Sequence, residues 1–244
     1  MEKYYIFART MSGKEKAFVV AVDGYSSTGK STVAKIVAAE LGFTYIDTGA
    51  MYRAVTLAAL ERGWIMDGEV CREALREHLT EIKIGFRYNR ELQRYETYLN
   101  GEYVEKKIRE MEVSNYVSPV AAVDFVRSFL VEQQREMGRN GRIIMDGRDI
   151  GSVVFPDADI KFFLTSSPQV RAERRYKELI EKGTQVSYEE VEANVRQRDY
   201  IDEHREASPL VRTPDAILID NSRMTIDDEV RFMVEKIKEK LNAA

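Results

Sequence analysis

The chain has 244 residues, a length that suits one large α/β domain with an insertion or two small domains. Hydrophobic residues make up 44% and charged residues 32% of the chain, which excludes a disordered tail or a low-complexity polymer. The 37 basic and 41 acidic residues give a net charge of -4, the wrong sign for a protein that coats nucleic acid. We therefore expect a globular protein without a nucleic-acid partner, in which any bound anion is met by a local cluster.

Cysteine and histidine are scarce. Cys71 is the one cysteine of the sequence, so it cannot form an intramolecular disulfide. One cysteine and two histidines are too few ligands for a structural zinc site of the usual cysteine and histidine type. No uncharged apolar run approaches the roughly 18 residues of a membrane span, and the first residues lack the apolar core and cleavage site of a signal peptide. We expect a cytoplasmic monomer without membrane contact.

The first regular elements form a strand, loop and helix unit. Residues 18–22 are continuously apolar, which favours a strand buried on both faces of a parallel sheet. Residues 32–41 place apolar side chains on one helical face, and Gly42 suits the C-terminal cap. A short strand at Tyr45 and Ile46 and a helix over 49–62 follow.

Between about residues 82 and 104 apolar and polar residues alternate, a hydrophobic period of two. This pattern predicts a small antiparallel sheet inserted into the α/β framework. Asn100-Gly101 is a strong hairpin signal, because both residues tolerate the positive φ of a type I′ turn. The aromatic residues of this segment are typical of core packing in such a sheet rather than of a base-stacking platform.

The framework then resumes with one helix over 117–138, strands over 142–145 and 160–164, and a helix opened by Ser167 and Pro168 that ends at Gly183. Ser187 and Glu190 predict a capping box for a helix running to about residue 206. A last strand over 216–219 precedes a helix that begins at Thr225. Strands that alternate with helices predict a parallel sheet with right-handed crossovers.

Residues 24–31 match the phosphate-loop pattern G-x-x-x-x-G-K-[ST], between a buried strand and an amphipathic helix. Its glycines let backbone amides turn towards an anion, Lys30 reaches the β and γ phosphates, and Ser31 suits Mg²⁺. The predicted ATP site in this segment comprises Gly24, Tyr25, Ser26, Ser27, Thr28, Gly29, Lys30, Ser31 and Thr32. No N-K-x-D or L-S-G-G-Q motif is present, which argues against guanine-specific signalling proteins and transporter ATPases.

Arginine clusters follow the loop. Asp146, Arg148 and Asp149 come just past a buried strand, where open α/β sheets bind ligands; Asp146 is placed to orient magnesium-bound water, Arg148 to hold phosphate and Asp149 to accept hydrogen bonds. A turn with a helix cap is the alternative for each residue.

Two further sets share a helical face, namely Arg171, Arg174 and Arg175, and Arg198, Asp202 and Arg205. Solvated helix surfaces with i, i+4 pairs remain the alternative for both sets. The two helices joined at Gly183 suggest a lid that closes over phosphates.

Residues 18–241 resemble bacterial cytidylate kinase. The resemblance is carried by the phosphate loop, the segment Asp47-Thr48-Gly49-Ala50-Met51-Tyr52-Arg53, the inserted sheet, residues 146–156 (DGRDIGSVVFP) and Arg198-Asp199. The chain departs from the family pattern at Tyr25 and Ser27, where the family usually has Pro and Gly, and at residues 1–16, which lie outside the resemblance. Whether Met11 is the true start stays open.

The resemblance implies a P-loop NTPase fold, an α/β architecture with a parallel β-sheet core flanked by helices, a small antiparallel β insert and a helical lid. It implies transfer of the γ-phosphoryl group of ATP to CMP or dCMP in pyrimidine nucleotide metabolism, with Mg²⁺. The implied catalytic residues are Lys30, Arg148, Arg174 and Arg205, with Arg171 and Arg175 at ATP and Ser31 and, through water, Asp146 at the metal. The implied CMP-binding residues are Thr48, Arg53, Ser118, Arg127, Arg148, Asp149, Arg198, Asp202 and Arg205.

The expected organisation is an N-terminal extension over 1–16, a kinase core over 17–62 and 117–244 with its lid at about 166–190, and a monophosphate-binding insert over 63–116. Two rival functions stay open: a kinase of this architecture for another acceptor, such as UMP or a small hydroxylated metabolite, and a regulatory protein that binds ATP without transferring phosphate. The preference between CMP and dCMP is also open.

Overall fold

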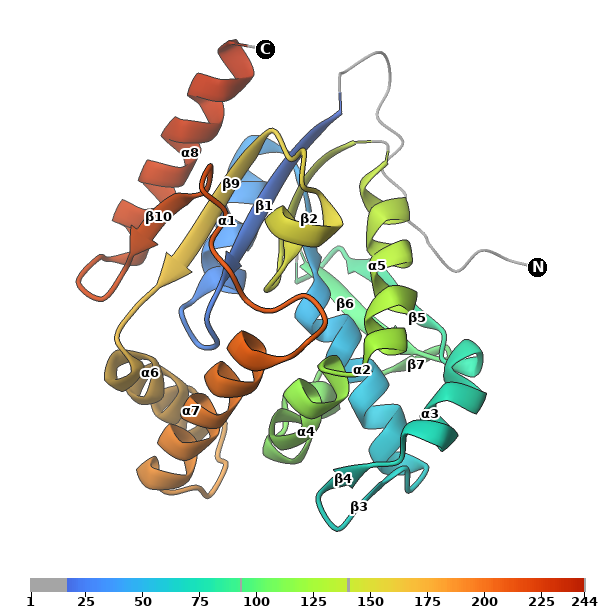
Figure 1. The fold of residues 1–244 in the computed structure, drawn as a ribbon. Helices are drawn as coiled ribbons and strands as arrows, with labels where there is room; N and C mark the ends of the chain where they lie inside the picture. The colour runs from blue at the N-terminus through green and yellow to red at the C-terminus, as the bar shows by residue number, and fades with distance from the viewer. Residues whose placement is uncertain (1–16, 93, 140, 244) are drawn as a thin grey trace. The chain divides into compact units, whose positions relative to one another are not determined.

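The computed structural model describes residues 17–92, 94–139 and 141–243 (Figure 1). The extension predicted over residues 1–16 lies outside these residues. The described chain packs as two compact units, a core unit of residues 17–47 and 138–243 and an inserted unit of residues 48–137. The inserted unit is wider than the predicted segment 63–116, because α2 (Thr48–Glu61) packs within it against α4 (Met111–Ala121) and against β6 (Arg94–Leu99).

The core unit is built on a five-stranded, fully parallel sheet with strand order β10-β9-β1-β8-β2. Its strands are β1 (Phe18–Gly24), β2 (Thr44–Asp47), β8 (Arg142–Asp146), β9 (Ile160–Thr165) and β10 (Ile217–Asp220). β1 is central, with Val22 paired with Asp146 of β8 and Gly24 paired with Leu164 of β9. The loops that follow β1, β8 and β9 therefore leave the same edge of the sheet, and the predicted α/β fold class is confirmed.

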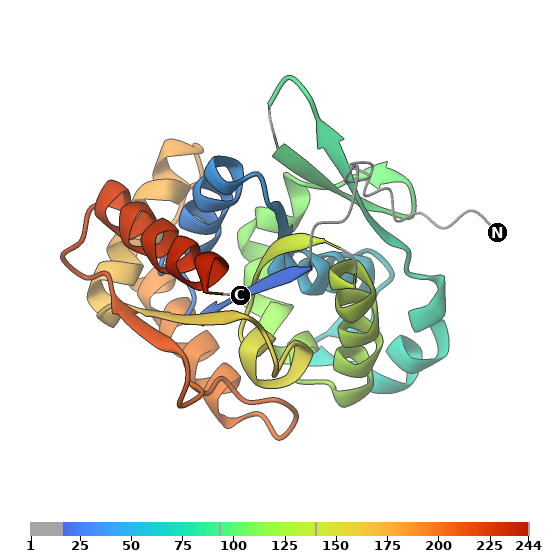
Figure 2. The same cartoon turned by 90° about the horizontal axis from the view of Figure 1, so that it is seen from above.

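Two helices of the core unit pack on this sheet because each presents one apolar face to it. The helices of the core unit are α1 (Lys30–Leu41), the π-helical turn η3 (Ile150–Val154), α6 (Pro168–Glu181), α7 (Tyr188–His204) and α8 (Ile226–Asn242). Val33 and Val37 of α1 and Met233 and Ile237 of α8 are buried in one cluster with the strands, and Figure 2 shows the two helices side by side. α6 and α7 form a helical hairpin beyond the carboxyl ends of the strands (Figure 1).

Local sequence signals set the helix starts of the core unit. Ser167 accepts a hydrogen bond from the Val170 amide ahead of Pro168, and Thr225 does the same for Asp228. Ser187 makes both hydrogen bonds of the predicted capping box. The predicted starts of α6, α7 and α8 are confirmed, because a side-chain oxygen satisfies an orphan amide at each one.

The inserted unit contains a three-stranded antiparallel sheet with order β5-β6-β7 and a two-stranded ribbon, β3-β4. Its elements are α2 (Thr48–Glu61), β3 (Ile65–Met66), β4 (Glu69–Val70), α3 (Arg72–His78), η1 (Leu79–Glu81), β5 (Ile84–Asn89), β6 (Arg94–Leu99), β7 (Glu102–Tyr103), η2 (Lys107–Arg109), α4 (Met111–Ala121) and α5 (Asp124–Gly138). Asn100 (φ 51°) and Gly101 (φ 90°) turn β6 into β7. The predicted hairpin is confirmed, since both residues adopt the positive φ that this turn requires.

One prediction was wrong: residues 117–138 form parts of two helices rather than one. α4 ends at Ala121 and α5 begins at Asp124. The amide of Val123 bonds the carbonyl of Val120, a tightened turn that ends α4. Val120, Val123 and Val126 are all buried, so the apolar period continues across the break and hides it in the sequence. No helix within the described residues is long and apolar enough to cross a membrane.

Candidate active site

The phosphate loop connects the end of β1 to the start of α1. Gly24 has φ 141°, and a Cβ there would collide with the Leu164 carbonyl of β9, so only glycine fits. Ser27 (φ 59°) and Gly29 (φ 88°) are also left-handed, a backbone pattern that turns successive amides into one concavity suited to an anion. The left-handed conformation costs an ordinary L-residue about 1 kcal/mol, so Ser27 carries strain that glycine would avoid.

Lys30 opens α1 with its side chain inside the loop, and only 5% of the residue is exposed. Its ammonium donates to the Tyr25 carbonyl and to the Thr28 hydroxyl. Burial, followed by the positive charge of Arg148, lowers the pKa of Lys30, and the carboxylates of Asp146 and Asp23 oppose that change. An ammonium has three donors, so Lys30 retains a donor for a phosphate oxygen.

Asp146 ends β8 next to the first turn of α1. The Ser31 hydroxyl donates to its Oδ2 at 2.9 Å, and the Tyr45 hydroxyl of β2 donates to its Oδ1 at 2.6 Å. Burial and the nearby Asp47 raise the pKa of Asp146, while Lys30, Tyr45 and Ser31 lower it. The two residues predicted to serve Mg²⁺, Ser31 and Asp146, thus lie in direct contact.

Asp202 of α7 holds two predicted phosphate-binding arginines. Arg148 Nε donates to Asp202 Oδ2 at 2.8 Å, and Arg205 Nη1 donates to Oδ1 at 3.5 Å. Burial by itself would raise the pKa of Asp202, but the charges of Arg148, Arg205 and Arg198 hold it below its ordinary value. Loss of solvent and the proximity of Arg148 lower the pKa of Arg198 to about 10. Several arginines thus surround one carboxylate, which leaves an excess of positive charge for an anion.

Two of the three predicted arginines of α6 contact the backbone of the phosphate loop. Arg171 donates to the carbonyls of Ser166 and Ser26 and pairs with Asp199 of α7, with Nη2 to Oδ2 at 2.6 Å. Arg174 donates to the Thr28 carbonyl at 3.4 Å. Arg175 pairs with Glu178 on its own helix at 2.9 Å. The core unit therefore brings Arg171 and Arg174 to the loop backbone.

Asp149, which is 2% exposed, belongs to the core unit between β8 and η3, and the four remaining predicted acceptor residues lie in the inserted unit. Thr48 and Arg53 belong to α2, Ser118 to α4 and Arg127 to α5. Arg53 donates to the Ile108 carbonyl at 3.0 Å. Arg127 donates to the carbonyl of Ala121 at 3.0 Å, and Ala121 lies one helical turn after Ser118 on α4. The guanidinium of Arg127 lies 5.2 Å from the centre of the Tyr52 ring. Ser118 and Arg127 are 2% and 3% exposed, so this unit gathers two buried polar groups near the end of α4.

Several residues at this edge of the core unit were missed by sequence reasoning. Tyr25 donates its hydroxyl to Glu203 of α7 at 2.6 Å, which links the phosphate loop to the helical hairpin. Asn221 donates to the Thr28 carbonyl at 2.7 Å and to Glu229, and it accepts from Arg174. Asp47 ends β2 as Asp146 ends β8, and Asp23 is the penultimate residue of β1, so the rule that selected Asp146 applied to them as well.

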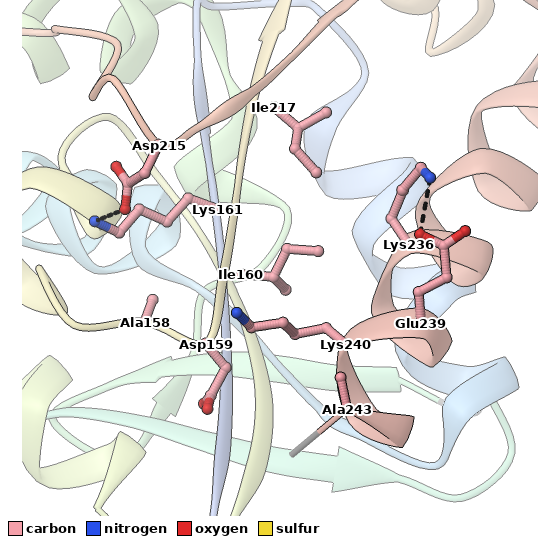
Figure 3. A pocket seen from close by; sticks show the side chains of 10 residues that line it. All are labelled: Ala158, Asp159, Ile160, Lys161, Asp215, Ile217, Lys236, Glu239, Lys240 and Ala243. Carbon is pink, nitrogen blue, oxygen red and sulfur yellow. Dashed lines mark hydrogen bonds and ion pairs between the residues drawn. The ribbon is translucent and has the colours of Figure 1, made fainter.

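A cavity of about 450 Å³ lies at the opposite end of the core sheet, beside the starts of β9 and β10 and the end of α8 (Figure 3). Its acidic side chains equal its lysines in number, and Lys161 pairs with Asp215 at 2.8 Å, as Lys236 does with Glu239. The positive charge of its lysines is therefore compensated locally, unlike that of the arginines around Asp202.

Comparison with known proteins agrees with this geometry. The family model described as cytidylate kinase matches residues 20–239. The cytidylate kinase of Phocaeicola vulgatus is 53% identical over 227 residues, which cover 93% of this chain and 99% of the relative. The cytidylate kinase of Parabacteroides distasonis is 54% identical over 221 residues, 91% of this chain and 96% of the relative. With a match this long and identity this high, the chain belongs to the cytidylate kinase family, a family of ATP-dependent nucleoside monophosphate kinases.

Proposed function

We propose that this protein transfers the γ-phosphoryl group of ATP to CMP or dCMP and releases ADP and the corresponding diphosphate. The observation that carries the proposal is the phosphate loop at the same sheet edge as the arginines around Asp202. Two phosphate-bearing substrates need this arrangement, since their negative charges must be neutralised before they meet. Membership of the cytidylate kinase family supports the assignment.

The core unit supplies the proposed catalytic residues. Lys30 neutralises charge on the donor phosphates, while Arg148 and Arg205 hold the acceptor phosphate from a position set by Asp202. Arg174, with Arg171 and Arg175 on the same helix, supplies charge at the transferring group. The acceptor is already a phosphate anion, so no protein base is needed and catalysis rests on positioning and charge neutralisation.

Mg²⁺ fits the donor set at the end of β8. Ser31 and Asp146 offer a hydroxyl and a carboxylate in direct contact, and Mg²⁺ prefers one or two such oxygens together with substrate phosphates and water. The described residues contain no cluster of three or more His, Cys, Asp or Glu that would bind a metal without a nucleotide. When bound, Mg²⁺ would neutralise phosphate charge, with Ser31 as a ligand and Asp146 acting through water.

The proposed reading of cytosine rests on Ser118, Arg127 and Asp149. Cytosine offers an amino donor, which suits a carboxylate, and N3 and O2 acceptors, which suit arginine and serine. Arg53 would hold the acceptor phosphate, Thr48 would reach the sugar, and Arg198 and Asp202 would lie near phosphate and sugar. In this scheme residues 63–116 belong to monophosphate binding, and residues 166–190 act as the lid.

The proposal places the protein in the cytoplasm as a monomer whose partners are small nucleotides rather than nucleic acid or a membrane. The net charge of -4 supports the exclusion of nucleic acid.

The test is ADP formation from ATP and Mg²⁺ with CMP, dCMP, UMP, AMP, GMP or no acceptor in parallel reactions. We expect strong stimulation by CMP and dCMP alone. Equal or greater stimulation by UMP would assign another acceptor, and slow hydrolysis without acceptor dependence would assign a nucleotide-binding protein instead. Either result contradicts the proposal.

Two variants connect the assay to the site. Lys30→Ala and Arg148→Ala are each expected to lower turnover with CMP by at least about a hundredfold, the scale of a lost charge-stabilising group. Lys238→Ala is the matched control, because this lysine of α8 is 57% exposed and lies 3.7 Å from Glu40. Turnover in Lys238→Ala should match the unaltered protein, and unchanged turnover in Lys30→Ala would contradict the assignment.

A further inference from the structure

Asp23 is a buried carboxylate to which none of the proposed roles above has been given. It is the penultimate residue of β1, immediately before the phosphate loop, and only 5% of it is exposed. Its Oδ1 accepts the amide of Ile150 at 2.8 Å, and its Oδ2 accepts the amide of Gly151 at 2.7 Å. Both oxygens are therefore committed to one backbone turn, the first two residues of η3.

That turn directly follows the proposed acceptor-binding residues Arg148 and Asp149. On the other side of them, the Gly147 amide donates to the Val22 carbonyl at 3.0 Å. Two consecutive residues of β1 thus hold the chain at both ends of the Arg148-Asp149 segment, Val22 through its backbone and Asp23 through its side chain. Because β1 leads into the phosphate loop, one strand carries both the donor loop and the restraints on the acceptor loop.

Gly151 gives independent support for a close approach at this point. A Cβ added to Gly151 would lie 3.3 Å from Asp23 Oδ2 and 3.0 Å from Lys161 Cδ, tighter than ordinary packing allows. The absence of a side chain at residue 151 therefore leaves the space that the Asp23 carboxylate occupies.

We infer that Asp23 is a positioning residue for acceptor binding and base selection, acting through the backbone of Ile150 and Gly151 on Arg148 and Asp149. The kinetic part of this inference rests on the proposed CMP kinase function. Burial raises the pKa of Asp23 to about 7, the negative charge of Asp149 acts in the same direction, and the two backbone hydrogen bonds and Lys30 oppose it. The two backbone hydrogen bonds thus hold this carboxyl group at a position where burial disfavours its charged form.

The test is Asp23→Asn, which preserves shape but turns one of the two acceptors into an NH₂ donor that faces a backbone amide. We expect the KM for CMP to rise at least tenfold and the ratio of kcat/KM for CMP to that for UMP to fall at least tenfold. The KM for ATP is expected to stay within threefold, because the hydrogen bonds of Lys30 to the phosphate loop do not involve Asp23.

The matched control is Asp159→Asn. Asp159 Oδ2 accepts the Val19 amide at 2.7 Å, so it also restrains β1 through one carboxylate, but near the amino end of the strand. Its variant should leave every kinetic constant within twofold. If Asp23→Asn raises the KM for ATP and CMP equally, or leaves the CMP to UMP ratio unchanged, the inference is overturned.

A readout independent of activity is amide hydrogen exchange at Ile150 and Gly151. Asp23→Asn should speed exchange there at least tenfold and leave Val19 unchanged; unchanged exchange at Ile150 and Gly151 overturns the inference even if the protein phosphorylates no CMP. If Asp23→Asn does not fold, Gly151→Ala disturbs the same contact from the other side. Gly151→Ala should likewise raise the KM for CMP more than the KM for ATP. A larger rise in the KM for ATP than in the KM for CMP refutes the positioning role.

Discussion

Asp202→Asn is the most informative single change in the core unit, because Asp202 is the carboxylate around which the phosphate-binding arginines are arranged. Its carboxylate accepts from Arg148 at 2.8 Å and from Arg205 at 3.5 Å, and the residue is 3% exposed. Asparagine keeps the shape and one acceptor oxygen but removes the negative charge. Arg148, Arg198 and Arg205 are then left with less compensation in a site with little solvent.

The magnitude follows from the burial. Removing one partner of a buried ion pair typically costs 3–5 kcal/mol, and a hydrogen bond to a charged group contributes about 1.5–3 kcal/mol. Because one acceptor remains in Asp202→Asn, we expect the free energy of unfolding to fall by about 3 kcal/mol. The matched control is Asp215→Asn, since the Asp215 carboxylate pairs with Lys161 at 2.8 Å but is itself 61% exposed, so solvent reaches it and we expect a smaller loss of stability there.

The assay is urea denaturation followed by circular dichroism for both variants, at pH 6, 7 and 8. The pKa of Asp202 is held below its ordinary value, so the carboxylate is charged in the folded and unfolded protein throughout this range. Its contribution to stability is present above the unfolded pKa and is lost only as the pH falls through the lower folded pKa. A loss in Asp202→Asn no larger than that in Asp215→Asn, or a loss that changes across these pH values, would refute the reasoning.

Three further predictions concern the same unit. Tyr25→Phe removes the 2.6 Å hydrogen bond to Glu203 but keeps the ring against Phe163. The free energy of unfolding should therefore fall by less than about 1.5 kcal/mol, while the KM for ATP rises two- to fivefold. Both quantities are measured beside Tyr176→Phe as the control. Asp23 faces Asp149, Lys30 and the side chain of Lys161 near Gly151. Burial raises the pKa of Asp23 to about 7, so the folded protein binds one more proton than the unfolded protein between about pH 4 and 7. The stability that this group contributes is present at low pH and is lost as the pH rises. At about 1.4 kcal/mol per pH unit, the free energy of unfolding of the unaltered protein should fall by about 2–3 kcal/mol relative to that of Asp23→Asn between pH 5 and 7. If urea denaturation gives the same pH dependence of this free energy for both proteins, the prediction is contradicted. Chelation of Mg²⁺ should abolish ADP formation and leave the circular dichroism melt of the nucleotide-free protein unchanged, and a large fall in melting temperature would indicate a structural metal instead.

The sequence by itself determined the parts of this protein that depend on local patterns. Continuous apolar runs predicted β1 and β8, the capping box at Ser187 predicted the start of α7, and Asn100-Gly101 predicted the turn between β6 and β7. The phosphate loop was recognisable for the same reason, because its glycines, Lys30 and Ser31 lie within eight consecutive residues. The spacing of residues along one element is enough to make each of these predictions.

Only the tertiary structure decided which side chains meet. The break between α4 and α5 was hidden because the apolar period continues across it, and the ribbon β3-β4 is too short to show a period. The contacts of Asp202 with Arg148, of Tyr25 with Glu203 and of Asp23 with the Ile150 amide join residues 54, 178 and 127 positions apart. A hydrogen bond across such a separation depends on the order and register of the strands, which place the ends of β1 and β8 side by side, and no local pattern encodes that order.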